Sequence, residues 1–127
     1  MGLSDGRVGA AIAVTDMNRA VEFYEGKLGL RSGGDDPDGG RTYQCGGGTT
    51  LHVFPSPIAR ASGATAAGFL IENVEGTVDD LTAKGVTFEQ YREGPFVTDD
   101  KGLARMDDYV GAWVKDPDGN VLAIGNV

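Results

Sequence analysis

The fold of this chain is decided by one stretch, Ala112-Trp113-Val114-Lys115-Asp116-Pro117-Asp118-Gly119-Asn120-Val121-Leu122-Ala123-Ile124. Its centre, from Asp116 to Asn120, has the composition of a turn. Pro fixes φ, Asp and Asn bond their own backbone, and Gly tolerates a positive φ. A short apolar run of strand-forming residues lies on each side of this turn. The stretch therefore predicts a β-hairpin.

Upstream of this hairpin, the first half of the chain alternates between strand and helix patterns. Asp16 is placed as a helix N-cap, and Gly29 as the C-terminal stop of that helix. The predicted elements are, in order, a strand at 8–14, a helix after Asp16, a strand at 30–32, a polar loop at 33–40, and a hairpin of strands 41–45 and 49–54. Residues 58–64 read as a linker because prolines break the pattern just before them.

The second half repeats this order. Asn73 is its helix cap, and Gly85 closes its helix. The predicted elements are a strand at 65–71, a helix after Asn73, a strand at 86–91, a long loop at 92–109, and the final hairpin of strands 111–115 and 121–125. Two copies of one module, about 7–56 and 64–126, are expected to pack within a single domain, 1–127.

Composition excludes several classes of function. The 127 residues carry a net charge of −8, which argues against nucleic-acid binding and is compatible with a cationic ligand. No apolar run approaches the ~20 residues of a membrane helix. Residues 1–7 show no signal-peptide pattern, and Cys45 is the only cysteine, so we expect a cytoplasmic protein without disulfides.

Together, the stretch Thr15-Asp16-Met17-Asn18-Arg19-Ala20-Val21-Glu22-Phe23-Tyr24 and the final hairpin resemble the vicinal oxygen chelate superfamily. It is also called the glyoxalase, bleomycin resistance and extradiol dioxygenase superfamily. The resemblance covers residues 8–124 and implies an α+β fold, in which two βαβββ modules form a cupped mixed sheet. It also implies a homodimer. It does not specify an activity, since one fold hosts many functions.

In metal-dependent members of that superfamily, each module supplies ligands, typically His, Glu or Gln, His and Glu, from its first and last strands. Carried over to this chain, the four positions fall on Gly9, His52, Ala66 and Ala123. Only His52 can donate to a metal, and one histidine does not hold a catalytic ion against water. We therefore expect no metal site and no cofactor.

Five residues are candidates for contact with a small molecule: His52, Trp113, Tyr43, Phe54 and Tyr91. Strand alternation places His52 and Phe54 on the concave side of the sheet if their apolar neighbours face the covering helix. Aromatic side chains on a concave sheet commonly line ligand pockets. They are as commonly core residues, and a histidine there can equally be solvated or internally bonded.

The leading hypothesis is a metal-independent protein that binds a drug or metabolite, cationic or aromatic, in the concave sheet. It is similar to the drug-sequestering bleomycin resistance branch. The alternative is a lyase or dioxygenase of the same superfamily, with unrecognised metal ligands or with His52 as general base. A structural or protein-binding role also stays open. The sequence identifies neither the ligand nor the dimer geometry.

Overall fold

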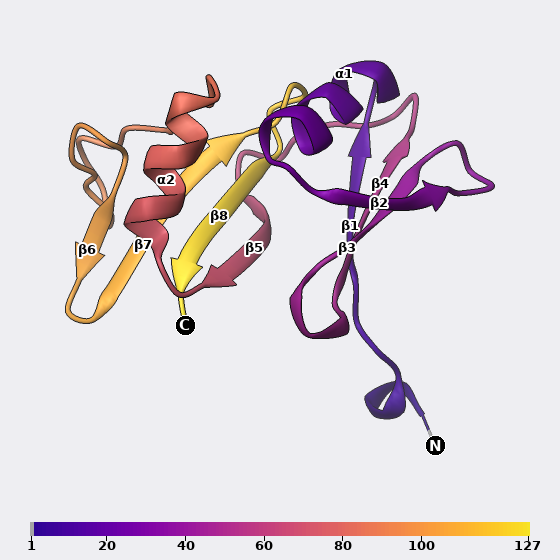
Figure 1. The fold of residues 1–127 in the computed structure, drawn as a ribbon, viewed down its shortest axis with the longest axis horizontal. Helices are drawn as coiled ribbons and strands as arrows, with labels where there is room; N and C mark the ends of the chain where they lie inside the picture. Colours follow the sequence, from indigo (N-terminus) through magenta and orange to yellow (C-terminus); the bar gives the residue numbers. More distant parts are fainter. Residues whose placement is uncertain (1) are drawn as a thin grey trace. The chain divides into compact units, whose positions relative to one another are not determined.

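The computed structural model describes residues 2–127 and divides the chain into two compact units between Arg60 and Ala61. This boundary falls in the segment 58–64 that the sequence predicts to be a linker. Met1, with which the predicted domain starts, lies outside the described residues. Each unit contains one four-stranded sheet and one principal helix, as Figure 1 shows.

The first unit forms a mixed sheet in the strand order β1-β4-β3-β2. β1 runs parallel to β4, and the other two pairs are antiparallel. Two short 3₁₀ turns, η1 (Leu3–Asp5) and η3 (Gly46–Gly48), also belong to it. Its main elements are β1 (Ala10–Val14), α1 (Met17–Val21), the π-helical continuation η2 (Glu22–Lys27), β2 (Arg31–Asp35), β3 (Arg41–Gln44) and β4 (Thr50–Pro55).

The second unit repeats this topology, with the strand order β5-β8-β7-β6 and a parallel β5–β8 pair. Its elements are β5 (Thr65–Ile71), α2 (Val74–Ala83), β6 (Ala104–Met106), β7 (Tyr109–Lys115) and β8 (Val121–Asn126). Strands and helices thus follow the βαβββ order twice. The predicted α+β class and the two modules are confirmed.

The deciding hairpin and both helix caps form as the residues predict. Asp116 N–H donates to the Asn120 carbonyl at 2.9 Å, which closes the turn between β7 and β8. The Asp16 carboxylate accepts from two amides of the first turn of α1. Asn73 Oδ1 accepts from Gly76 N–H at 2.9 Å and so caps α2. These side-chain bonds satisfy amides that a helix leaves unpaired at its start.

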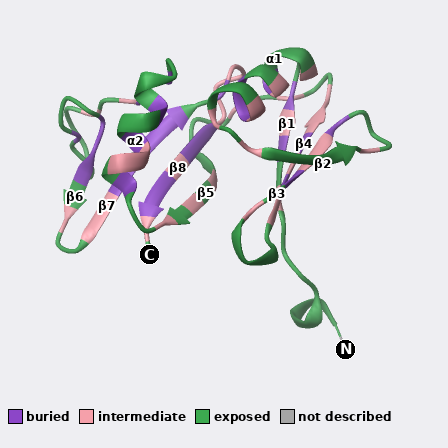
Figure 2. Ribbon diagram, in the orientation of Figure 1, coloured by how far each residue is buried: buried purple, intermediate pink, exposed green. Residues whose placement is uncertain are grey.

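Both units carry buried residues on their strands and helices, drawn in purple in Figure 2. In the first unit the buried apolar residues are Ile12, Val14, Ala20, Phe23, Tyr24, Tyr43, Leu51 and Val53. In the second they include Val74, Val78, Leu81, Ala112, Val114, Leu122 and Ile124. No helix within residues 2–127 is both long and apolar enough to cross a lipid bilayer.

The predicted strand at 86–91 is wrong. Only Phe88 pairs there, in an isolated bridge to Val114, and the strand beside β7 is instead β6, inside the predicted loop 92–109. Both segments occupy the edge of β7 that β8 leaves free, since β8 takes the other edge. The chain leaves the sheet after Phe88 and returns at β6, so two separate segments pair with the same edge of β7.

β2 is longer than the predicted strand 30–32, because it continues to Asp35 into the predicted polar loop. Its pairing with β3 is irregular between Ser32 and Asp35, and every residue of β2 is exposed. Without apolar alternation in Ser32-Gly33-Gly34-Asp35, the sequence pattern carries no strand signal.

Gly40, the residue just before β3, packs closely against β4. A Cβ atom there would lie 2.3 Å from the Val53 carbonyl oxygen, whereas one at Gly46 meets nothing within 4 Å. We predict that Gly40→Ala lowers the free energy of unfolding by about 2 kcal/mol or more, because backbone must move to relieve the overlap. Urea denaturation measures this loss.

Gly46→Ala is the matched control, and its unfolding free energy should stay within about 0.5 kcal/mol of the wild type. Equal stability of the Gly40→Ala variant and the wild type would contradict the close packing of Gly40 against β4.

Candidate functional site

The side chains of β4 point alternately to two faces of the first sheet. Leu51 and Val53 are buried, at 2% and 0% exposure. His52 and Phe54 are half-buried on the other face, and their rings stack with centroids 5.4 Å apart and 14° between planes. This other face is called the His52 face below. Leu51 and Val53 thus take the buried positions on which the expected facing of His52 and Phe54 depends.

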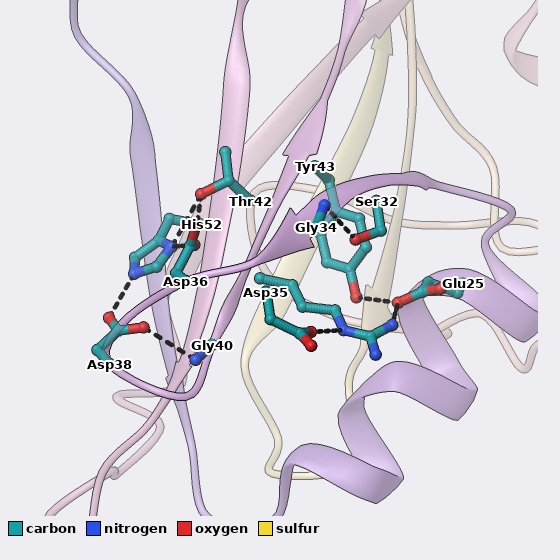
Figure 3. Close-up of polar contacts among 11 residues, drawn as sticks. Glu25, Ser32, Gly34, Asp35, Asp36, Asp38, Gly40, Thr42, Tyr43 and His52 are labelled. Atoms are coloured by element: carbon teal, nitrogen blue, oxygen red, sulfur yellow. Dashed lines mark hydrogen bonds and ion pairs between the residues drawn. The ribbon is translucent and has the colours of Figure 1, made fainter.

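His52 lies between two carboxylates. Its Nδ1 is 2.9 Å from Asp36 Oδ2, and its Nε2 is 2.8 Å from Asp38 Oδ2. Figure 3 shows both contacts, with the two aspartates reaching the imidazole from the turn between β2 and β3. Both ring nitrogens are therefore engaged by acidic oxygens from one short loop.

Each of these carboxylates is held by a second group outside the trio. Thr42, which pairs with His52 across β3 and β4, donates its hydroxyl to Asp36 Oδ2 at 2.7 Å. Gly40 N–H donates to Asp38 Oδ1 at 2.8 Å. That backbone bond, followed by the bond to His52, lowers the pKa of Asp38 below its ordinary value of 3.8. Asp38 is thus held as a carboxylate at neutral pH.

The loop that carries the two aspartates repeats the turn of the deciding hairpin. Asp36-Pro37-Asp38-Gly39 has the same four residue types as Asp116-Pro117-Asp118-Gly119. In both, the first Asp N–H bonds the carbonyl four residues on, at 2.8 and 2.9 Å, and the glycine has a positive φ, 86° and 88°. Sequence reasoning missed Asp36 and Asp38, although this repeated motif was the available signal.

Tyr43 does not share the His52 face. It pairs with Leu51, is fully buried, and stacks on Tyr24 of the helix with ring centroids 6.1 Å apart. Its hydroxyl donates to Glu25 Oε2 at 3.0 Å, and burial raises the pKa of that hydroxyl. Tyr43 therefore lies on the face of the sheet opposite His52, and its contact with a ligand stays a prediction. It is a core residue, because one step along a strand reverses the face.

In the second unit, three aromatic rings meet. Trp113 on β7 lies 5.6 Å from Tyr91 and 5.4 Å from Phe96 between ring centroids. Trp113 is 8% exposed, whereas Phe96 is 39% exposed. The structure thus brings together the predicted Trp113 and Tyr91 and adds Phe96, which the sequence pattern within the loop 92–109 does not single out. These three rings are called the Trp113 cluster below.

Three of the four positions that the resemblance implies for metal ligands lack donor side chains. Gly9 lies just before β1, and a Cβ there would meet Thr50 Oγ1 at 2.9 Å. On β8, Ala123 pairs with Gly68 of β5, two residues after Ala66. Neither Gly nor Ala carries a ligand atom, so these positions with His52 do not fit the metal centre of the superfamily.

The structure brings other donors to His52 instead. Ligand atoms of Asp36, Asp38 and His52 all lie within 4.8 Å of one another. Cys45 is not one of these grouped donors, and burial raises the pKa of its thiol, which makes it a poorer nucleophile at neutral pH. The local chemistry is therefore that of one imidazole and two carboxylates on a partly exposed face of the sheet.

Comparison with known proteins gives a consistent family and fold. The model of the Glyoxalase/Bleomycin resistance protein/Dioxygenase superfamily matches residues 7–124. A solved superfamily member from Sphaerobacter thermophilus is 24% identical, with a TM-score of 0.66 over 96% of this chain and 98% of its own. A glyoxalase/bleomycin resistance protein/dioxygenase from Alicyclobacillus acidocaldarius is 18% identical, with a TM-score of 0.70 over 96% and 91%.

A genomically encoded fosfomycin resistance protein, FosX, from Listeria monocytogenes is also similar. It is 13% identical, with a TM-score of 0.66 over 96% of this chain and 93% of its own. No curated protein matches the sequence. At these identities the solved structures support the fold alone.

The bonds around Asp38 predict a pH dependence of stability. Folding lowers the pKa of Asp38, so its carboxylate stabilises the folded chain at pH values above about 3.8. This stabilisation is lost as the pH falls through the pKa that Asp38 has in the folded chain. Asp38→Asn removes the charge at every pH. The stability difference between wild type and Asp38→Asn should be full near pH 6 and shrink below about pH 4. Urea denaturation across this range measures it.

An exposed aspartate on α2, Asp80, serves as the control. The unfolding free energy of the Asp80→Asn variant should equal that of the wild type at every pH. If the difference in unfolding free energy between wild type and Asp38→Asn is the same at neutral and acidic pH, the Asp38 charge does not contribute to stability.

Proposed function

Because the chain belongs to the Glyoxalase/Bleomycin resistance protein/Dioxygenase superfamily, we propose that it binds a small molecule without using the metal centre of that superfamily. One observation carries this proposal: Gly9, Ala66 and Ala123 replace three of the four implied ligands. The mechanism is capture, in which no bond of the ligand is made or broken. A drug or a metabolite is the proposed ligand.

The Trp113 cluster is the proposed contact surface in the second unit. Flat aromatic rings bind planar apolar groups well, and the exposed edge of Phe96 offers such a surface to solvent. In the first unit, the stacked His52 and Phe54 rings offer a second one. The net charge of −8 favours a cationic ligand over an anionic one. We therefore propose a planar or cationic aromatic molecule.

We further propose that the protein is a cytoplasmic homodimer. The single Cys45 suits a reducing compartment, in which thiols stay free. The dimer is carried over from the superfamily resemblance, and light scattering of the purified protein tests it.

The alternative is a lyase or dioxygenase with ligands other than the four implied positions. The grouping of Asp36, Asp38 and His52 favours it. His52 is a poor general base in this arrangement, because each ring nitrogen already contacts a carboxylate. Turnover of a glyoxalase or dioxygenase substrate that disappears in His52→Ala would favour the enzyme over the binding protein.

Trp113 allows a direct test, since it is the only tryptophan in the chain. We predict that a planar cationic ligand, found in a panel that includes bleomycin, changes its fluorescence in a saturable way. Phe96→Ala should weaken that binding roughly threefold to tenfold, because an aromatic contact contributes about 0.5–1.5 kcal/mol. Fluorescence titration measures both affinities.

Ile58→Ala is the control, because Ile58 is an apolar side chain with 87% exposure in the other unit. Its affinity should equal that of the wild type, and dialysis against a chelator should leave all the affinities unchanged. Binding that vanishes with the chelator and returns with a metal ion would contradict metal-free capture.

A further inference from the structure

We propose that Asp36, Asp38 and His52 form a binding site for a divalent transition-metal ion. Each residue offers one ligand atom, and these atoms lie within 4.8 Å of one another. Two of the three come from the turn between β2 and β3, and the third from β4. The proposal does not rest on the proposed ligand-binding function.

The site differs from the centre that the superfamily resemblance implies. That centre needs donors at Gly9, Ala66 and Ala123, which this chain lacks. Here the two carboxylates come from a loop that contributes none of those four positions. His52 is the only residue common to both sets.

The donor set selects the class of ion. One imidazole nitrogen with two carboxylate oxygens suits Zn²⁺, Co²⁺ or Ni²⁺, whereas Ca²⁺ and Mg²⁺ prefer oxygen ligands alone. Two negative carboxylates and a neutral imidazole also balance the charge of a divalent cation. Three protein ligands leave room for water or another small ligand on the ion.

All three side chains are oriented by groups outside the trio. The Thr42 hydroxyl donates to Asp36 at 2.7 Å, and Gly40 N–H donates to Asp38 at 2.8 Å. The His52 ring stacks on Phe54. Such outer contacts orient metal ligands and reduce the conformational freedom that binding would remove. Figure 3 shows the two carboxylates beside the imidazole ring, one at each ring nitrogen, before any ion is present.

The same geometry gives the ion a place to enter. The Asp38 carboxylate contacts His52 Nε2 at 2.8 Å, and its side chain is 47% exposed. An ion arriving from solvent would replace this direct contact by bonds from the nitrogen and the carboxylate oxygen to the metal. Asp36 and His52 are 28% and 29% exposed, so neither is sealed from water. Ion binding then joins the turn 36–40 to β4.

The test uses protein without an affinity tag, so that His52 is the only histidine. Its ring Cε1 proton then gives a single histidine resonance in the proton NMR spectrum. Co²⁺ added to one equivalent should shift or broaden that resonance. Calorimetric titration with Zn²⁺ alone should show saturable binding with the same stoichiometry.

Variants locate the ion. His52→Gln should abolish the calorimetric signal, and Asp38→Asn should weaken the affinity by at least about tenfold, the scale of a lost contact in a metal site. Asp80→Asn removes an exposed acidic charge elsewhere and should bind like the wild type. Circular dichroism confirms that each variant is folded before titration.

Two outcomes would overturn the proposal. The first is an unperturbed His52 resonance with no saturable heat in the folded wild type, which would leave the trio as an ion pair that fastens the turn to β4. The second is Zn²⁺ binding that persists in the His52→Gln variant but disappears in the Cys45→Ser variant. That result would assign the ion to the Cys45 thiol.

Discussion

Alternation of side chains along one inner strand of each sheet, β4 or β8, is the constraint on which the rest of the structure depends. β4 lies between β1 and β3, and β8 lies between β5 and β7. Burial of Leu51 and Val53 fixes which face His52 takes, just as burial of Leu122 and Ile124 fixes the face of Ala123. A slip of one residue would exchange core and site together.

Local signals made much of this fold predictable. The turn from Asp116 to Asn120, the Asp16 and Asn73 caps and the repeated order of elements depend on neighbours in the chain, and the structure contains them all. The predicted strand at 86–91 failed for a nonlocal reason. Which segment pairs with the free edge of β7 is decided by the path of the long loop, and no periodicity in the sequence encodes that path.

The candidate site shows the same division between local and nonlocal information. His52 lies on the face opposite Leu51 and Val53, whereas Tyr43 lies on the buried face because β3 pairs it with Leu51. The sequence alone fixes neither facing, since a shift of one residue in register reverses it. Asp38 meets His52 across 14 positions of sequence. The sequence Asp36-Pro37-Asp38-Gly39 predicts a turn, but it does not predict that Asp38 contacts His52. Gly9, Ala66 and Ala123 carry no ligand atoms at the positions that the resemblance implies, whereas this turn brings two carboxylates to His52.

The location of a bound ion tests this account most directly. Anomalous diffraction from crystals of the full chain grown with Co²⁺ would show it. The account predicts an anomalous peak enclosed by Asp36, Asp38 and His52 and none beside Gly9, Ala66 or Ala123. A peak beside any of those three residues, or none at the Asp36–Asp38–His52 trio, would contradict it.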